Sequence, residues 1–255
     1  MAPTRAYNPV MPSKDLKAEY RRPEVVSEYD ARRFSSRAGQ RRNRRKIAAI
    51  AKALALIERP GLVLDVPCGT GRFFQFLSSS GLRFVGADIS EPMLRESLAK
   101  TTDAPPLGLV AADCESLPFK DASFDIVLSI RFLFHMTGEG RVRALAEMAR
   151  VSRRFLILDY RLRYSLKNAV HICLASVGLK RPLRRPTRGE MLGELRAAGI
   201  EPVAIFPVTR FFSDKTIVLC RHIAARVAPE PGPVRIETKA GARPPEPSRP
   251  GAPVR

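Results

Sequence analysis

Residues 62–74 read LVLDVPCGTGRFF, and this stretch decides the fold. An apolar run ends in an acid, Asp65, and a Pro-Cys-Gly-Thr-Gly turn then leads into two phenylalanines. A short buried strand followed by a glycine turn and a helix is typical of the first unit of nucleotide-binding α/β folds, although a plain strand–turn–helix corner gives the same pattern. Gly69 and Gly71 lie where the backbone takes a positive φ or approaches a ligand. The single G-x-G and the acid favour a ligand with a cationic group over a pyrophosphate.

Three further apolar runs follow, and each leads into polar residues. Residues 82–87 (LRFVGA) end at Asp88, 23 residues after Asp65, where a doubly wound sheet holds the two hydroxyls of a ribose. Residues 107–112 end at Asp113, and residues 124–130 (FDIVLSI) lead into RFLFHM. The series predicts an α/β fold whose ligand lies at the carboxyl ends of the strands.

This series resembles the class I S-adenosylmethionine-dependent methyltransferases of the small-molecule type, which includes quinone and sterol methylases. The matching motifs are DVPCGTG (65–71), GADIS (86–90), AADCESLPF (111–119) and FDIVLSIRFLFHM (124–136), within a resemblance that covers residues 29–221. The resemblance implies a Rossmann-like three-layer sandwich around a seven-stranded, mostly parallel sheet with an antiparallel last strand. Pro67 departs from the family, most members of which carry glycine there, so we expect a stiffer turn.

The resemblance also implies S-adenosylmethionine as the cofactor. We expect Asp65 to bind its ammonium group, Asp88 its ribose hydroxyls and Asp113 its adenine amino group. The other expected cofactor contacts are Gly69, Gly71, Ile89, Met93, the backbone N–H of Cys114, Ser129, Ile130 and, in the N-terminal helical segment, Tyr29, for which packing in the core is the alternative.

The residues that would meet a methyl acceptor are fewer. His135 follows the fourth strand, and a histidine there can deprotonate a hydroxyl group near neutral pH, with a structural role as the alternative. Arg131 is a candidate for binding an acidic acceptor, or is simply solvated, and Tyr160 is a candidate for lining the acceptor pocket. We expect no metal site, because displacement at a sulfonium chiefly needs positioning and exclusion of water.

The domain organisation follows from composition and periodicity. We expect a disordered lead-in over residues 1–23, a methyltransferase domain over 24–223 and a disordered Pro/Gly/Ala-rich tail over 224–255. Within the domain we expect a helical lid over 24–60 and a basic, apolar insert over 161–186. The lid contains a helix over 41–57, with an apolar stripe at positions 47, 50, 51, 54 and 57. Thr187 and Glu190 form a predicted capping box for a helix that ends before Gly199.

The net charge of +19 is unevenly distributed. Residues 1–60 hold 15 Lys/Arg against 6 Asp/Glu, residues 61–160 hold 11 against 12, and residues 161–225 hold 12 against 4. The basic flanks reflect either an arginine-rich proteome or attraction to an anionic partner. One hypothesis is peripheral contact with an anionic membrane through the apolar residues 169–179 and the cations that bracket them.

The sequence leaves three function classes open. The favoured one is a methyltransferase acting on a small-molecule or lipid-linked acceptor. The second is an RNA or protein methyltransferase, which the basic flanks support; nucleic acid is the less favoured partner, because SIRF (129–132) stands where amino-group methylases carry Asn/Asp-Pro-Pro-aromatic. The third is a silent cofactor-binding subunit. Four dispersed cysteines and the absence of a recognisable signal predict a cytoplasmic protein, with the inner membrane face as the site of any peripheral contact. The oligomeric state is left open.

Overall fold

The computed structural model describes residues 36–100, 105–163, 185–209 and 214–223. The helices among them are α4 (Arg37–Leu54), α5 (Phe74–Ser79), α6 (Glu91–Lys100), the 3-10 helix η1 (Leu133–His135), α7 (Gly138–Val151) and α9 (Arg188–Ala197). The strands are β1 (Val63–Asp65), β2 (Phe84–Asp88), β3 (Leu109–Ala111), β4 (Phe124–Ser129), β5 (Ser152–Arg161), β6 (Ile200–Pro207) and β7 (Lys215–His222).

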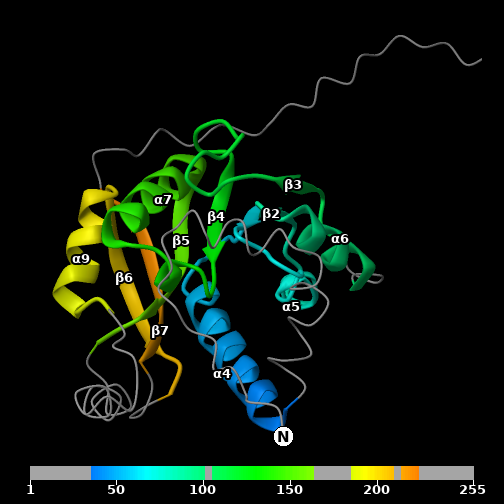
Figure 1. Cartoon of the computed structure of the whole chain (residues 1–255), viewed down its shortest axis with the longest axis horizontal. Coiled ribbons are helices and arrows are strands. Elements are labelled where there is room, and N and C mark those ends of the chain that lie inside the picture. Colours follow the sequence, from blue (N-terminus) through cyan, green and yellow to red (C-terminus); the bar gives the residue numbers. More distant parts are fainter. Residues whose placement is uncertain (1–35, 101–104, 164–184, 210–213, 224–255) are drawn as a thin grey trace, which may run out of the picture.

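The seven strands form one sheet in the order β3-β2-β1-β4-β5-β7-β6 (Figure 1). The pairs from β3 to β5 are parallel, and β7 runs antiparallel to both β5 and β6. The strand order reverses on either side of β1, between β2 and β4, which is the switch point at which α/β folds bind ligands. The predicted fold class is confirmed.

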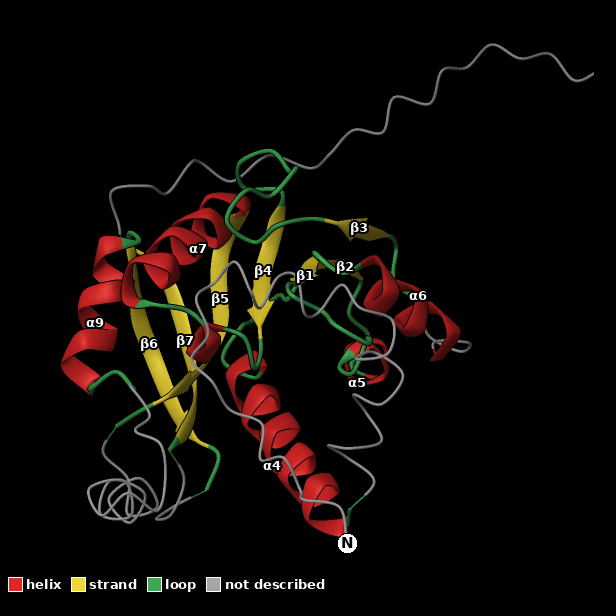
Figure 2. Ribbon diagram, viewed as in Figure 1, coloured by secondary structure: helices red, strands yellow, loops and turns green. Residues whose placement is uncertain are grey.

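Helices cover the sheet on both faces (Figure 2). Side chains of α4 and α5 pack with one core cluster, which includes Ile126, Ile157 and Leu219. Side chains of α7 and α9 pack with the other, which includes Val127, Leu158 and Val218. Because neighbouring strand residues point to opposite faces, consecutive positions of β4, β5 and β7 fall in different clusters. The core is therefore two apolar layers separated by the sheet.

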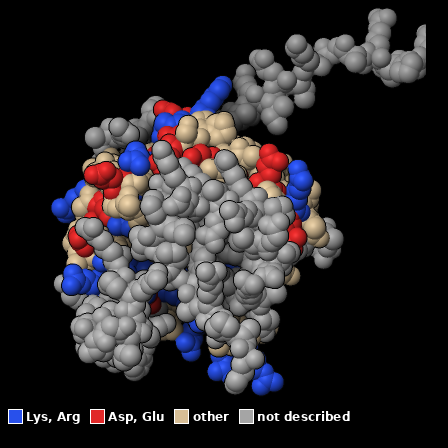
Figure 3. All heavy atoms as spheres, viewed as in Figure 1, with Lys and Arg blue, Asp and Glu red and all other residues tan. Residues whose placement is uncertain are grey.

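Helix α4 begins four residues earlier and ends three residues earlier than the helix predicted over 41–57. Ser36 caps it by accepting a hydrogen bond from the N–H of Gly39 at 3.1 Å. The predicted apolar stripe is confirmed except at Ala51, which is exposed: positions 50 and 57 are buried, and positions 47 and 54 are half-buried against the same cluster. Lys46, Ala49 and Ala53 are buried beside this stripe. Five arginines of its first half are exposed, at positions 37, 41, 42, 44 and 45. Figure 3 shows Lys and Arg side chains at the lower end of the molecule, where Figure 1 places the start of α4.

The capping box of α9 is confirmed. The Thr187 hydroxyl accepts from the N–H of Glu190 at 3.1 Å, and the Glu190 carboxylate accepts from the N–H of Thr187 at 2.6 Å. Thr137 caps the start of α7, where its hydroxyl accepts from the N–H of Gly140 at 3.4 Å. The predicted lead-in, residues 24–35 of the predicted lid, residues 169–179 of the insert and the tail lie outside the described residues.

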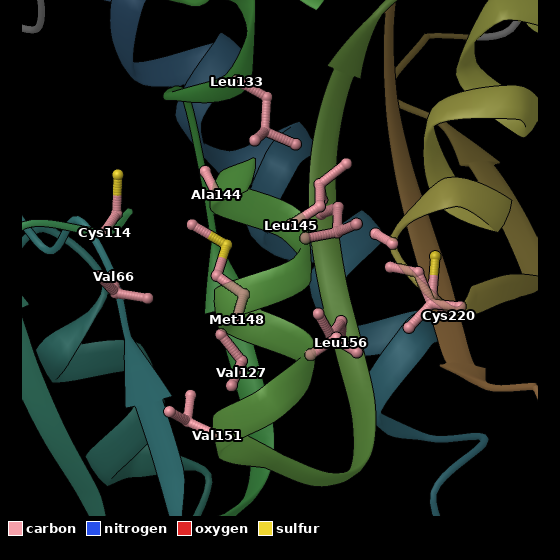
Figure 4. Close-up of a cluster of buried hydrophobic side chains, with 14 of the residues drawn as sticks. Val66, Cys114, Val127, Leu133, Ala144, Leu145, Met148, Val151, Leu156 and Cys220 are labelled. Atoms are coloured by element: carbon pink, nitrogen blue, oxygen red, sulfur yellow. The ribbon is translucent and has the colours of Figure 1, made fainter. Parts of the chain in front are cut away.

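Helix α7 carries the apolar residues that fill one of the two layers (Figure 4). Leu145 and Met148 are fully buried and lie against β4 and β5, beside Val127 and Leu156. Deleting a buried leucine side chain removes its transfer free energy and leaves a cavity.

We therefore predict that Leu145→Ala lowers the free energy of unfolding by about 3 kcal/mol. Leu98→Ala is the matched control, because Leu98 is 58% exposed on α6 and should cost less than about 0.5 kcal/mol. Equilibrium urea unfolding of both variants measures the difference. Equal midpoints would contradict this account of the core.

Candidate functional site

Three neighbouring parallel strands end at the same edge of the sheet, and each carries a buried polar atom there. Asp65 ends β1, Ser129 ends β4 and Asp159 is near the end of β5. Both carboxylate oxygens of Asp65, the Ser129 hydroxyl and Oδ1 of Asp159 have no hydrogen-bond partner among the described residues. Buried polar groups in folded proteins are nearly always hydrogen-bonded, so a row of unsatisfied atoms marks a place where a polar ligand binds.

Asp65 is the most strained of these groups electrostatically. Its side chain is almost wholly buried, and burial followed by repulsion from Asp88 raises its pKa well above the usual range. A cationic group at this position would favour the charged carboxylate and reverse that shift. Asp65 therefore suits the ammonium group that the sequence assigned to it.

The turn after Asp65 depends on two glycines. Gly69 has φ +55° and Gly71 has φ +69°, a region that residues with a side chain rarely adopt. A Cβ at Gly71 would lie 2.8 Å from side-chain atoms of both Phe74 and Ser97, whereas a Cβ at Gly69 would meet nothing within 4 Å. Gly71 thus serves packing against α5 and α6, and Gly69 leaves a bare stretch of backbone at the edge.

Asp88 closes the turn onto the neighbouring strand. Its Oδ2 accepts from the N–H of Gly69 at 2.8 Å, and its Oδ1 accepts from the N–H of Ser90 at 2.9 Å. Burial raises the pKa of Asp88, and the bonds from the backbone oppose that shift. Each carboxylate oxygen can accept a further hydrogen bond, so Asp88 is positioned to bind two hydroxyl groups at once.

The remaining predicted cofactor residues lie along the same edge. Met93 is buried on α6, and its N–H donates to the Ser90 hydroxyl at 3.3 Å. Asp113 follows β3, and its Oδ1 accepts from the N–H of Glu115 at 3.1 Å. Of the others, Ile89 follows β2, Cys114 is buried just after β3, and Ile130 is buried just after β4. Tyr29 lies outside the described residues.

Sequence reasoning missed Lys46. This residue of α4 is buried and forms an ion pair with Oδ2 of Asp159, which also accepts from the N–H of Arg131 at 3.1 Å. Burial lowers the pKa of Lys46, and Asp159 opposes that shift. A signal was present: Lys46 precedes Ala49, Ile50 and Ala53 by 3, 4 and 7 residues, which puts it on their face of the helix.

His135 and its neighbours form a stack at the end of β4. His135 belongs to η1, and its ring centroid lies 4.2 Å from that of Phe134. The guanidinium of Arg161 lies over the ring of Phe134, 3.6 Å from its centroid. Arg131 has φ +66°, which turns the chain from β4 towards η1. A catalytic role for His135 stays a prediction.

Tyr160 does not fit the pocket-lining role predicted for it. It is 1% exposed and lies in the cluster covered by α7 and α9, where its hydroxyl donates to Glu194 at 3.3 Å. The reason is strand alternation, which points Asp159 and Tyr160 to opposite faces of the sheet. At the carboxyl end of β5, the residues on the same face as Lys46 are Asp159 and Arg161.

Comparison with protein families matches residues 64–155 to the family described as "Methyltransferase domain". Among curated proteins, the chain is 34% identical over 96 residues to the human "Probable tRNA methyltransferase 9B", a match covering 37% of this chain and 20% of that protein. It is 34% identical over 130 residues to the demethylmenaquinone methyltransferase of Renibacterium salmoninarum, covering 51% of this chain and 52% of that protein. The matched segment thus spans about half of the second relative and a fifth of the first.

Solved structures share the fold. The magnesium protoporphyrin IX methyltransferase of Synechocystis PCC 6803 with bound SAH has a TM-score of 0.68 at 20% identity, over 83% of this chain and 100% of that one. The 1,6-didemethyltoxoflavin-N1-methyltransferase of Burkholderia thailandensis has a TM-score of 0.59 at 21% identity, over 85% and 93%. With the family match, the strand order and the acid-ended strands around a glycine turn, the chain contains a methyltransferase domain of the class I, S-adenosylmethionine-dependent type.

Proposed function

We propose that this chain transfers the methyl group of S-adenosylmethionine to a small-molecule or lipid-linked acceptor. The observation that carries the proposal is the row of unsatisfied buried polar atoms at the ends of β1, β4 and β5, led by both oxygens of Asp65. Burying an unpaired carboxylate costs free energy, and a bound cation offsets that cost.

The residues present fit this cofactor. Asp65 would hold the ammonium group, and Asp88 would accept from the ribose hydroxyls while keeping its bonds to Gly69 and Ser90. The open backbone at Gly69 admits a close approach. When bound, the cofactor supplies an electrophilic methyl group on a sulfonium. The contribution of the chain is to orient that group, exclude water and, at His135, accept a proton from the acceptor.

A second candidate is methylation of RNA. The chain is 34% identical over part of its length to a probable tRNA methyltransferase, and 37% identical over 90 residues to the bovine 18S rRNA (guanine-N(7))-methyltransferase. The five exposed arginines of α4 would attract phosphates. The unsatisfied polar atoms favour the first candidate, because they are buried at the edge of the sheet and do not lie on the exposed surface of α4.

Membrane contact and a cytoplasmic location stay proposals. No helix in the described part of the chain is both long and apolar enough to cross a membrane. The insert residues 169–179 that we expect to contact anionic lipid lie outside the described residues. The cations that bracket this segment would have to lie near the headgroups for binding to be stable.

Transfer of labelled methyl groups in a cell extract tests the proposed function. The purified chain and methyl-labelled S-adenosylmethionine are added, and the extract is separated into lipid, small-molecule, RNA and protein fractions. We expect label in the lipid or small-molecule fraction. Label in RNA or protein would favour the other candidate, and no label despite cofactor binding would identify a silent subunit.

We predict that Asp88→Ala weakens binding of S-adenosylmethionine about thirty- to hundredfold, because the ribose hydroxyls lose a charged acceptor. Isothermal titration calorimetry measures the affinity. Asp125→Ala is the matched control: Asp125 also accepts a backbone bond, from the N–H of Leu62 at 2.8 Å, but it lies near the start of β4, at the opposite edge. Equal affinities for the two variants would refute the assignment.

We predict that Asp65→Asn stabilises the cofactor-free protein while weakening cofactor binding. The folded-state pKa of Asp65 is raised, so its contribution to stability is lost as the pH rises above the unfolded value of about 4. The stability advantage of the variant should therefore grow with pH, by up to about 1.4 kcal/mol per unit, until the folded pKa is passed. Urea unfolding between pH 4.5 and 8 measures this. If the free energies of unfolding of the two proteins changed in parallel with pH, burial would not raise the pKa of Asp65.

A further inference from the structure

Two cations face each other where β5 and β7 meet at the carboxyl edge of β5. Arg161 and Lys215 are directly paired in the antiparallel ladder between these strands. Like charges in directly opposed positions destabilise a sheet. Lys46 and Arg131 are close enough that their charges act on the same pair. Four cations, from α4, the turn after β4, β5 and β7, thus lie near one another.

Two carboxylates, Asp159 and Asp214, act on both cations, but each also has another partner. Asp159 pairs with Lys46 and accepts from the backbone of Arg131. Asp214 forms an ion pair with Arg185 at 2.5 Å. Arg161 has no ion pair with any described residue, and its buried Nε has no hydrogen-bond partner there. Its guanidinium rests on the ring of Phe134 instead.

The electrostatics of the pair agree with this arrangement. Burial, followed by the charges of Arg161 and Lys46, lowers the pKa of Lys215 to about 8. Burial also lowers the pKa of Arg161; the charges of Asp159 and Asp214 oppose that shift, and those of arginines 185 and 131 add to it. Buried charges of one sign are costly unless an opposite charge compensates them. An anion at this position would remove both the repulsion and the unsatisfied donor.

The place of the cluster connects it to the methyl acceptor. Phe134 contacts both Arg161 and His135. Arg131 directly follows Ser129 and Ile130, which we assign to the cofactor. The cluster therefore adjoins the proposed cofactor residues at the end of β4.

We propose that Arg161 and Lys215 bind an anionic oxygen group, a phosphate or a carboxylate, of the methyl acceptor. This inference rests on the proposed function and narrows it to acidic acceptors. The planar guanidinium offers paired N–H donors that match two oxygens of either group, and Phe134 fixes its plane. Lys215 adds a point charge from the opposite strand.

Binding of inorganic phosphate to the full chain tests the site itself. Phosphate is titrated at constant ionic strength, with sodium chloride replaced as phosphate is added, and the thermal midpoint is followed. We expect stabilisation by phosphate, with an apparent affinity about tenfold weaker in both Arg161→Gln and Lys215→Gln. Sodium acetate in a parallel titration distinguishes a preference for carboxylate. The matched control is Arg154→Gln, which removes an exposed cation at the other end of β5 and should leave the affinity unchanged.

The proposal is overturned if phosphate and acetate both fail to stabilise the protein beyond sodium chloride. It is also overturned if Arg154→Gln weakens the apparent phosphate affinity as much as Arg161→Gln and Lys215→Gln do. In phosphate-free buffer, Arg161→Gln should raise the thermal midpoint, because it relieves the repulsion with Lys215. A lowered midpoint would mean that Arg161 supports the fold and would also count against an anion site.

Methyl transfer in the extract tests the link to the acceptor. We expect the labelled product to be retained on an anion-exchange resin, and Arg161→Gln to lower its yield at least tenfold with unchanged affinity for S-adenosylmethionine. A labelled product that is neutral or cationic would overturn the inference while leaving the proposed function intact. If the wild-type chain did not bind S-adenosylmethionine, the proposed function would be overturned instead. The phosphate titration would still report on the anion site.

Discussion

The buried ion pair between Lys46 and Asp159 organises the edge of the sheet where the chemistry is proposed to occur. It attaches α4 to β5, and the second contact of Asp159, with the N–H of Arg131, fixes the turn after β4. From that turn the chain enters η1, which sets the positions of Phe134 and His135. A buried pair of this kind contributes little net stability compared with an apolar pair, but removing one partner costs about 3–5 kcal/mol. Its value here is therefore geometric, because a single carboxylate determines where a helix and a loop lie.

The site also holds several of the buried polar atoms that have no hydrogen-bond partner among the described residues. Asp65 is buried and Arg161 is half-buried, and each has a buried side-chain atom without a hydrogen-bond partner among the described residues. They lie on the same face of the sheet, on β1 and β5, with opposite charges and separate positions along the edge. A ligand system with a cationic end and an anionic end would compensate both. Asp65 and Arg161 lower the stability of the protein without ligand, and binding of two oppositely charged groups at fixed positions would recover that stability.

The sequence predicted where the proposed cofactor residues lie along the sheet, because its signals are local. Asp65 and Asp88 each follow an apolar run directly, Gly69 lies in the turn between them, and the carboxyl ends of parallel strands must share an edge. The acceptor half depends on pairings between distant residues, which no local pattern reports. The contact of Lys46 with Asp159 spans 113 positions, and the opposition of Arg161 and Lys215 follows from the register of β5 with β7. The pocket-lining role predicted for Tyr160 could have been avoided, since alternation along β5 puts Tyr160 on the face opposite Asp159.

The antiparallel direction of β7 has an evolutionary consequence. Because this strand runs back against β5, its first residue, Lys215, returns to the edge where the parallel strands end. The residues that bind the anionic group in our proposal, Arg161 and Lys215, lie outside the segment that matches the methyltransferase family, residues 64–155, whereas His135 and the proposed cofactor residues from Asp65 to Ile130 lie inside it. The proposed anion site is thus encoded apart from the residues that hold the methyl donor. Substitutions at the end of β5 and the start of β7 can change which charged molecules are methylated without changing those residues.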